Sequence, residues 1–176
     1  AKNLHIKKFS VIGVSGGGPY AAACAYKLPK LLHRSGIVVG LGPTYVPGLL
    51  DGLGLNGLGW RSYSWSRKLR DLSTFSYKIL VNCLPFLVKF LYRAREDQRL
   101  MSNNMNCLFI KSVKEGLKQG TKGLSWDLNL YTHNWSFNLQ NIKTPVSLWY
   151  GEKDRSVTLA MARHFNTQIP KSKLTI

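Results

Sequence analysis

Apolar runs and segments of helical spacing alternate along this sequence. Residues 9–14 and 37–39 are short, nearly continuous apolar runs, and such runs are typical of parallel strands that other elements cover on both faces. Between them, the alanine-rich residues 19–27 predict a helix, which Leu28-Pro29 ends. The start of the chain is therefore predicted to form a strand, a helix and a second strand.

The middle of the chain predicts helices. Residues 48–60 are punctuated by glycine and are expected to form a loop. From residue 61 to residue 120, apolar residues recur at helical spacing and make a stripe that Pro85 interrupts. The members of this stripe are Leu69, Leu72, Phe75, Ile79, Leu80, Leu84, Leu87, Val88, Leu91 and Tyr92, followed later by Leu108, Val113 and Leu117. We assign residues 45–125 to a helical insertion.

The C-terminal part returns to an alternation of strand and helix. Residues 146–150 predict a third strand, residues 159–168 a helix, and residues 173–176 the beginning of a fourth strand. With 176 residues, the chain has the length of one domain. The sequence therefore predicts a single α/β domain over residues 1–176, in which the helical insertion interrupts a parallel sheet.

A G-x-S-x-G pattern stands where the first predicted strand meets the first predicted helix. Residues 13–17 read Gly-Val-Ser-Gly-Gly. In a strand–turn–helix context this pattern forms a nucleophile elbow, in which the serine has strained backbone angles and an exposed hydroxyl. Gly13 and Gly17 are expected to face each other across the turn, where a side chain would collide. The pattern predicts that Ser15 is a nucleophile.

Two phosphate-binding motifs compete for the same glycines. Gly13, Ser15 and Gly18 have the spacing of a dinucleotide fingerprint whose middle glycine is replaced, but that fingerprint requires an acidic residue about twenty positions later. No carboxylate occurs between the second predicted strand and Asp51, and no Gly-Lys-Ser/Thr follows, as a P-loop would require. The elbow is therefore favoured, and no cofactor is expected.

The chain is strongly basic, with 25 Lys and Arg against 8 Asp and Glu and a formal net charge of +17. Such a charge is compatible with nucleic acid, an anionic membrane surface or a lysine-rich source proteome. The basic residues of segment 61–122 are spread among apolar residues at helical spacing, and they form no block of five. This distribution favours a solvated helix face, so no nucleic-acid partner is expected.

The sequence also indicates what to expect of membrane insertion, cellular location and metal binding. The longest apolar stretch, residues 79–92, contains Asn82, Pro85 and Lys89 and is too short to span a bilayer, so no stable membrane insertion is expected. The three cysteines are widely spaced without a C-x-x-C pair, and no secretory signal opens the chain, which predicts a reducing, cytoplasmic location. The four histidines lack the spacing of metal ligands, so no metal is expected.

Several stretches together resemble a known family. They are residues 9–25 around the elbow, 126–128 together with 135–137, 142–154 with its Gly-Glu-Lys-Asp turn, and 161–170. In order and spacing they are similar to the α/β-hydrolase fold, in the branch of serine hydrolases with a helical lid, over nearly the whole chain from residue 9. The resemblance implies a serine hydrolase of ester, amide or lactone bonds with a Ser-Asp-His triad.

The resemblance also implies roles for particular residues. Asp154 matches the acid of the triad, with Glu152 as a weaker candidate, and the backbone N–H of Gly16 matches one oxyanion-hole donor. The second donor and the histidine would lie outside this chain, which begins without an initiator Met and stops inside a predicted strand. The native protein is therefore expected to be longer. Residues 1–176 alone are expected to be inactive and poorly soluble, because the elbow strand would be an unpaired apolar edge.

The histidines of this chain are weak candidates for the missing base. His5 and His33 lie on the wrong side of their strands, and His164 lies on a helix and is expected at the surface. His133 follows the insertion and could line a pocket. The sequence places none of the four against the Ser15 hydroxyl, as a general base requires.

The aromatic residues of the lid indicate the substrate. These residues are Trp65, Phe75, Phe86, Phe90 and Tyr92. They imply a small molecule with an apolar acyl or aromatic group. A non-catalytic binding protein of the same fold, or a decayed copy of an enzyme, is the alternative function. The sequence does not set the oligomeric state.

Overall fold

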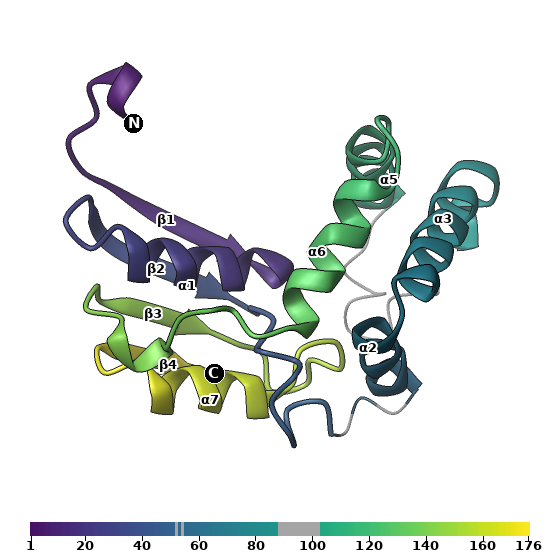
Figure 1. The fold of residues 1–176 in the computed structure, drawn as a ribbon. Coiled ribbons are helices and arrows are strands. Elements are labelled where there is room, and N and C mark those ends of the chain that lie inside the picture. Colours follow the sequence, from purple (N-terminus) through teal and green to yellow (C-terminus); the bar gives the residue numbers. More distant parts are fainter. Residues whose placement is uncertain (52, 54, 88–102) are drawn as a thin grey trace.

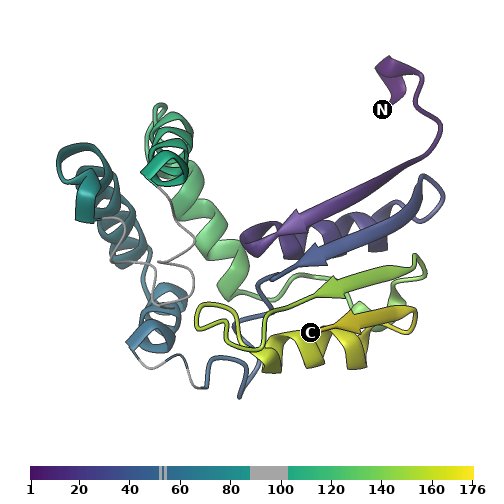
Figure 2. The same ribbon diagram turned by 180° about the vertical axis from the view of Figure 1, so that it is seen from behind.

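The computed structural model describes residues 1–51, 53, 55–87 and 103–176. In these residues four strands form one parallel sheet in the order β1-β2-β3-β4 (Figures 1 and 2). The strands are β1 (Phe9–Val14), β2 (Leu32–Val38), β3 (Val146–Trp149) and β4 (Ser172–Thr175). The α/β class with a parallel sheet, which the sequence predicts, is therefore confirmed.

Two helices cover one face of the sheet, as the two opposite views show (Figures 1 and 2). They are α1 (Gly18–Lys27) and α7 (Leu159–Gln168). Helix α1 packs through Ala21, Ala22 and Ala25, which are buried, and their small side chains let the helix lie close to the strands. The centre of the core consists of the fully buried side chains of Ile37, Ile142, Leu148, Met161, Phe165 and Ile169.

Helices occupy the chain between β2 and β3. They are α2 (Leu55–Trp65), α3 (Arg67–Cys83), α5 (Asn103–Gly116) and α6 (Lys122–Thr132). Figure 1 shows them beyond the carboxyl ends of the strands, with α6 next to the end of β1. Helix α6 runs past residue 125, where the sequence analysis ended the insertion. Three members of the predicted apolar stripe, Val88, Leu91 and Tyr92, lie outside the described residues.

The prediction of a loop over residues 48–60 is wrong in its second half, because α2 begins at Leu55. Glycine disfavours a helix when local propensity alone decides. Tertiary contact explains the difference: Gly57 is buried, and a Cβ at that position would lie 3.0 Å from the carbonyl oxygen of Leu50. A glycine here lets the helix pack against the preceding turn, which the sequence pattern alone does not reveal.

The prediction that β1 is covered on both faces is also wrong. Ile12 and Val14 are 72% and 57% exposed, whereas Gly13 is buried and Val11 partly buried. The strand therefore alternates between an inner and an outer face. An apolar run specifies a strand, but the elements that cover each face depend on the rest of the fold.

The second strand begins earlier than predicted, at Leu32 instead of residue 37. Its polar first half hides it from a search for apolar runs. Ser35 is nevertheless buried, because its hydroxyl donates a hydrogen bond to the carbonyl oxygen of Ala21 at 3.2 Å. A buried polar side chain is tolerated when it is hydrogen-bonded in this way.

We expect the 176-residue chain to self-associate through β1, because no strand in the described residues pairs with its outer edge and its outer face exposes Ile12 and Val14. Ile12→Lys should shift the chain toward monomer by placing a charge on this edge strand. Sedimentation velocity over a range of protein concentrations measures the change. The control is Leu58→Lys, which adds the same charge at an exposed apolar position of α2. A monomeric wild-type chain, or equal effects of both variants, would contradict the prediction.

Candidate active site

The turn between β1 and α1 has the strained conformation that the sequence predicts. Strand β1 ends at Val14, a 3-10 turn spans Ser15–Gly17, and α1 begins at Gly18. Ser15 has a φ of +51° and is exposed. A residue with a side chain costs roughly 1–3 kcal/mol in this region of backbone space. The surrounding structure must therefore hold Ser15 in place, with its side chain presented at the carboxyl edge of the sheet.

The two glycines of the elbow are not equivalent. A Cβ at Gly13 would lie 2.1 Å from the carbonyl oxygen of Gly17 and 2.8 Å from the Cβ of Ala21. Position 13 therefore admits only glycine unless the turn opens. A Cβ at Gly17 would meet nothing within 4 Å. The expectation that both positions exclude a side chain is confirmed for Gly13 and wrong for Gly17, because at Gly17 the Cβ would point into open space.

A second pair of glycines, which the sequence analysis missed, brings α1 against the loop after β2. A Cβ at Gly18 would lie 2.7 Å from the Cα of Gly40. The backbone N–H of Leu41 donates a hydrogen bond to the carbonyl oxygen of Ser15 at 2.9 Å. The only signal in the sequence is the spacing of glycines on either side of the second apolar run. This close approach fixes the elbow to its neighbouring strand.

Asp154 lies in the turn after β3, at the same edge of the sheet as Ser15. Its Oδ1 accepts hydrogen bonds from the backbone N–H groups of Ser156 at 2.7 Å and Val157 at 3.0 Å. These bonds order the turn and leave Oδ2 as the oxygen that can face a base. Glu152, the weaker candidate for the acid, is exposed.

Tyr150 connects the Asp154 turn to the loop after β2. Its side chain is buried, and its hydroxyl donates a hydrogen bond to the carbonyl oxygen of Gly40 at 2.8 Å. Burial raises the pKa of Tyr150, and the negative charge of Asp154 raises it further. The hydroxyl therefore stays protonated and keeps this bond at neutral pH. The structure thus brings the loops that carry Ser15, Gly40 and Asp154 to one edge.

No histidine in the described part of the chain forms a hydrogen bond with Ser15. His33 lies near the amino end of β2, and His5 precedes β1. His164 is half-buried on α7, where burial lowers its pKa. His133 does line a cavity, but its Nδ1 is 2.8 Å from the carbonyl oxygen of Asn129.

A side chain from the insertion reaches the elbow. A Cβ at Gly16 would lie 2.7 Å from the hydroxyl oxygen of Tyr131, which belongs to α6. Sequence reasoning missed Tyr131, because an aromatic residue on a helix has no local pattern that links it to a distant serine. The hydroxyl of Tyr131 therefore lies beside Gly16 in the elbow.

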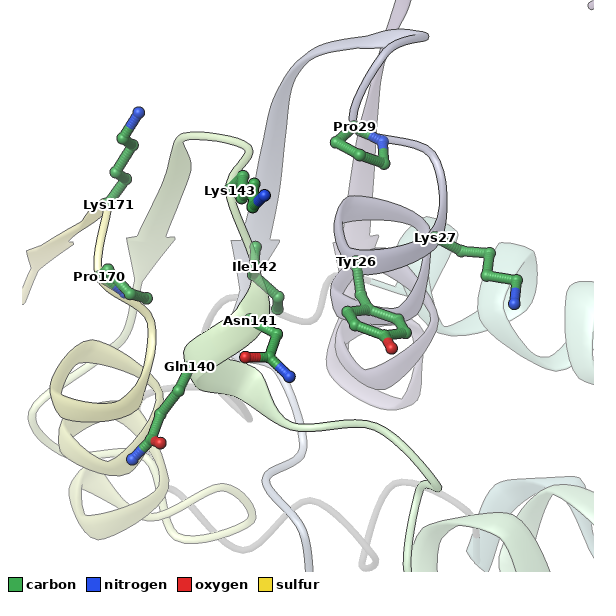
Figure 3. Close-up of a pocket in the computed structure, with 9 residues that line it drawn as sticks. All are labelled: Tyr26, Lys27, Pro29, Gln140, Asn141, Ile142, Lys143, Pro170 and Lys171. Carbon is green, nitrogen blue, oxygen red and sulfur yellow. The ribbon is translucent and has the colours of Figure 1, made fainter.

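One cavity lies away from these groups. It has a volume of about 790 Å³ and lies at the amino ends of β3 and β4, beside the end of α1 (Figure 3). Three lysines line it, namely Lys27, Lys143 and Lys171, but Figure 3 shows their ammonium groups pointing in different directions. A cavity of about 370 Å³ lies between the loop after β2 and α2, lined in part by Tyr45, Leu50 and Trp60. Of these two cavities, the second lies on the side of the insertion.

The fold is similar to that of solved α/β hydrolases. The structural neighbours include a bromoperoxidase from Bacillus anthracis (TM-score 0.65, 16% identity, 99% of this chain and 60% of that chain). They also include an α/β hydrolase fold protein from Nakamurella multipartita (0.60, 19%, 98% and 61%). A third is a meta-cleavage product hydrolase from Pseudomonas fluorescens (0.58, 16%, 98% and 57%). At these identities the likeness shows the fold alone, and this chain has the α/β-hydrolase fold.

At the level of sequence, no protein-family model matches this chain, and no curated protein matches it. The chain spans 57% to 61% of the length of the three structures named above. Within the described ranges, no helix is both long and apolar enough to cross a membrane.

Gly17 and Gly18, at the start of α1, provide a test of the close approach between α1 and Gly40. Gly18→Ala should lower the free energy of unfolding by about 1–3 kcal/mol, because its Cβ would meet backbone that cannot rotate away. Gly17→Ala, one residue earlier, should change it by less than about 1 kcal/mol. Urea denaturation of both variants measures the difference. Equal stability of the two variants would show that α1 does not approach Gly40 as closely as described.

Proposed function

We propose that this chain belongs to a serine hydrolase that cleaves ester, amide or lactone bonds with Ser15 as nucleophile. The observation that carries the proposal is the φ of +51° at an exposed serine, between a strand and the start of a helix. A strained residue of this kind persists only where surrounding contacts hold it, and such strain gathers at functional sites. In the α/β-hydrolase fold this turn exposes the nucleophile, and the neighbours include a hydrolase by name.

In the proposed reaction, Oγ of Ser15 attacks the substrate carbonyl carbon while a histidine accepts the hydroxyl proton. The carbonyl π electrons move to the oxygen, and the backbone N–H of Gly16 donates a hydrogen bond to the resulting oxyanion. Asp154 accepts a hydrogen bond from the other imidazole N–H and stabilises the imidazolium. The histidine then protonates the leaving alcohol or amine, and water releases the acyl group by the same steps.

We further propose that the histidine and the second backbone donor of the oxyanion hole lie outside residues 1–176. Three observations support this. No described histidine forms a hydrogen bond with Ser15, the chain spans about three fifths of comparable structures, and the outer face of β1 exposes Ile12 and Val14. The chain by itself would then be inactive. The cytoplasmic location stays a prediction. The three cysteines are free thiols in the structure, as that location would require.

The helical insertion between β2 and β3 is proposed to act as a lid over an apolar acyl or aromatic substrate. The cavity beside α2 supports this, since Tyr45, Trp60 and Trp65 contribute aromatic surface to it. Phe75 and Phe86, which the sequence analysis included, are exposed. Phe90 and Tyr92 lie outside the described residues. The aromatic surface thus comes from α2 and the loop before it more than from α3.

Covalent labelling tests the role of Ser15. The full-length protein that carries this chain should react with a fluorophosphonate probe, and Ser15→Ala should abolish the labelling, because the probe forms its bond with an activated serine. Mass spectrometry of the labelled peptide measures the site. The control is Ser136→Ala, since Ser136 also has a positive φ, +58°. Labelling that survives Ser15→Ala would contradict the proposal, and a folded protein that does not label would support the non-catalytic binding alternative.

The charge of Asp154 is tested separately from its part in the turn. Asp154→Asn keeps an Oδ1 that can accept the N–H groups of Ser156 and Val157, but it removes the negative charge that stabilises the imidazolium. The rate of ester hydrolysis by the full-length protein should fall by roughly 10³-fold or more. Glu152→Gln removes the same charge two residues away and should leave the rate unchanged. The reverse result would assign the acid to Glu152.

A further inference from the structure

Tyr131 reaches the elbow from the far end of α6. The helix ends at Thr132, so Tyr131 lies on its last turn. A Cβ at Gly16 would lie 2.7 Å from the Tyr131 hydroxyl oxygen. The N and Cβ of one residue are about 2.5 Å apart, so this oxygen lies within roughly 5 Å of the Gly16 nitrogen. An oxygen atom about 2.9 Å from each of two donors can bridge donors that far apart.

Two aromatic rings contact the ring of Tyr131, and a hydrogen bond holds its backbone. It makes edge-to-face contacts with Tyr20 on α1, at 6.1 Å between ring centroids, and with Trp60 on α2, at 6.3 Å. The carbonyl oxygen of Tyr131 accepts a hydrogen bond from the hydroxyl of Thr44 at 2.8 Å. The side chain is half-buried. A ring fixed in this way presents its hydroxyl to the elbow without a conformational change.

A carboxylate, Asp127, lies near both tyrosines. The hydroxyl of Tyr20 donates a hydrogen bond to Oδ1 of Asp127, which lies one helical turn before Tyr131 on α6. Burial raises the pKa of Tyr131, and the charge of Asp127 raises it further, although the neighbouring Tyr20 hydroxyl opposes this shift. Tyr131 therefore remains a neutral phenol that carries a proton to donate at neutral pH.

We propose that the hydroxyl of Tyr131 is an oxyanion-hole donor of this enzyme, in addition to the backbone N–H of Gly16. The inference rests on the proposed serine hydrolase function. When Oγ of Ser15 forms its bond with the carbonyl carbon, the electron pair of the carbonyl π bond moves to the oxygen. Tyr131 donates a hydrogen bond to that oxygen and keeps its proton, so it stabilises the charge without taking part in proton transfer.

Tyr131→Phe in the full-length protein tests this role, because it removes the hydroxyl and keeps the ring contacts. For hydrolysis of a p-nitrophenyl ester, kcat should fall by about 10²–10³-fold, as expected for loss of one oxyanion donor, while KM changes by less than about threefold. The matched control is Tyr26→Phe. Tyr26 lies at the end of α1 that is remote from the elbow, where it stacks on Phe137. The kcat of this variant should equal that of the wild type.

A second variant changes Gly16, the residue that lies beside the Tyr131 hydroxyl. Gly16→Ala places a Cβ 2.7 Å from Tyr131 Oη, which is too close for two unbonded atoms, and should displace the hydroxyl. If both changes act on one hydrogen bond, the double variant with Tyr131→Phe should have nearly the same kcat as either single variant. Fully multiplicative losses would overturn the inference.

The outcomes separate this inference from the proposed function. If Ser15 labels and the ester is hydrolysed, but Tyr131→Phe retains wild-type kcat, the inference is overturned and the serine hydrolase stands. If the folded wild-type protein neither labels nor hydrolyses the ester, the proposed function fails and the inference falls with it. A loss of kcat confined to Tyr131→Phe and Gly16→Ala supports both.

Discussion

The close approach of Gly18 to Gly40 is the contact on which the rest of the candidate site depends. The two backbones meet where the first turn of α1 crosses the loop after β2, with room for no Cβ at position 18. The N–H of Leu41 then reaches the carbonyl oxygen of Ser15. Because these contacts are made by backbone atoms, they cannot relax by a change of rotamer. They hold Ser15 at a positive φ that would otherwise be unfavourable.

The loop after β2 is also connected to the turn that carries Asp154. Gly40, which receives α1 on one side, accepts the hydrogen bond of the buried Tyr150 hydroxyl on the other. Tyr150 begins the segment that leads from β3 to Asp154, whose carboxylate is held by two backbone N–H groups. Ser15 and Asp154, the proposed nucleophile and acid, therefore follow the carboxyl ends of β1 and β3, which lie on either side of β2 in the parallel sheet. Open α/β sheets place their ligands at this edge.

Sequence reasoning succeeded where local pattern decides the structure and failed where distant contacts decide it. The strand over residues 9–14, the helix of α7 and the strained Ser15 all follow from short-range spacing. Helix α2 was missed because burial of Gly57 against Leu50 overrides the low helix propensity of glycine. The open space beside Gly17 and the approach of Tyr131 to Gly16 depend on how separate segments pack, and no window of sequence contains that information.

If Tyr131 has the proposed role, the insertion takes part in the chemistry as well as covering the site. Asp127 and Tyr131 belong to α6, whereas Tyr20 and Gly16 belong to the elbow and its helix. The hydrogen bond between Tyr20 and Asp127 therefore joins two residues that are 107 positions apart in the chain. Under the proposed role of Tyr131, a movement of α6 away from the elbow to admit a substrate would remove one oxyanion donor. Complete stabilisation of the oxyanion would then require α6 in its docked position, and closure of the insertion would be coupled to the chemical step.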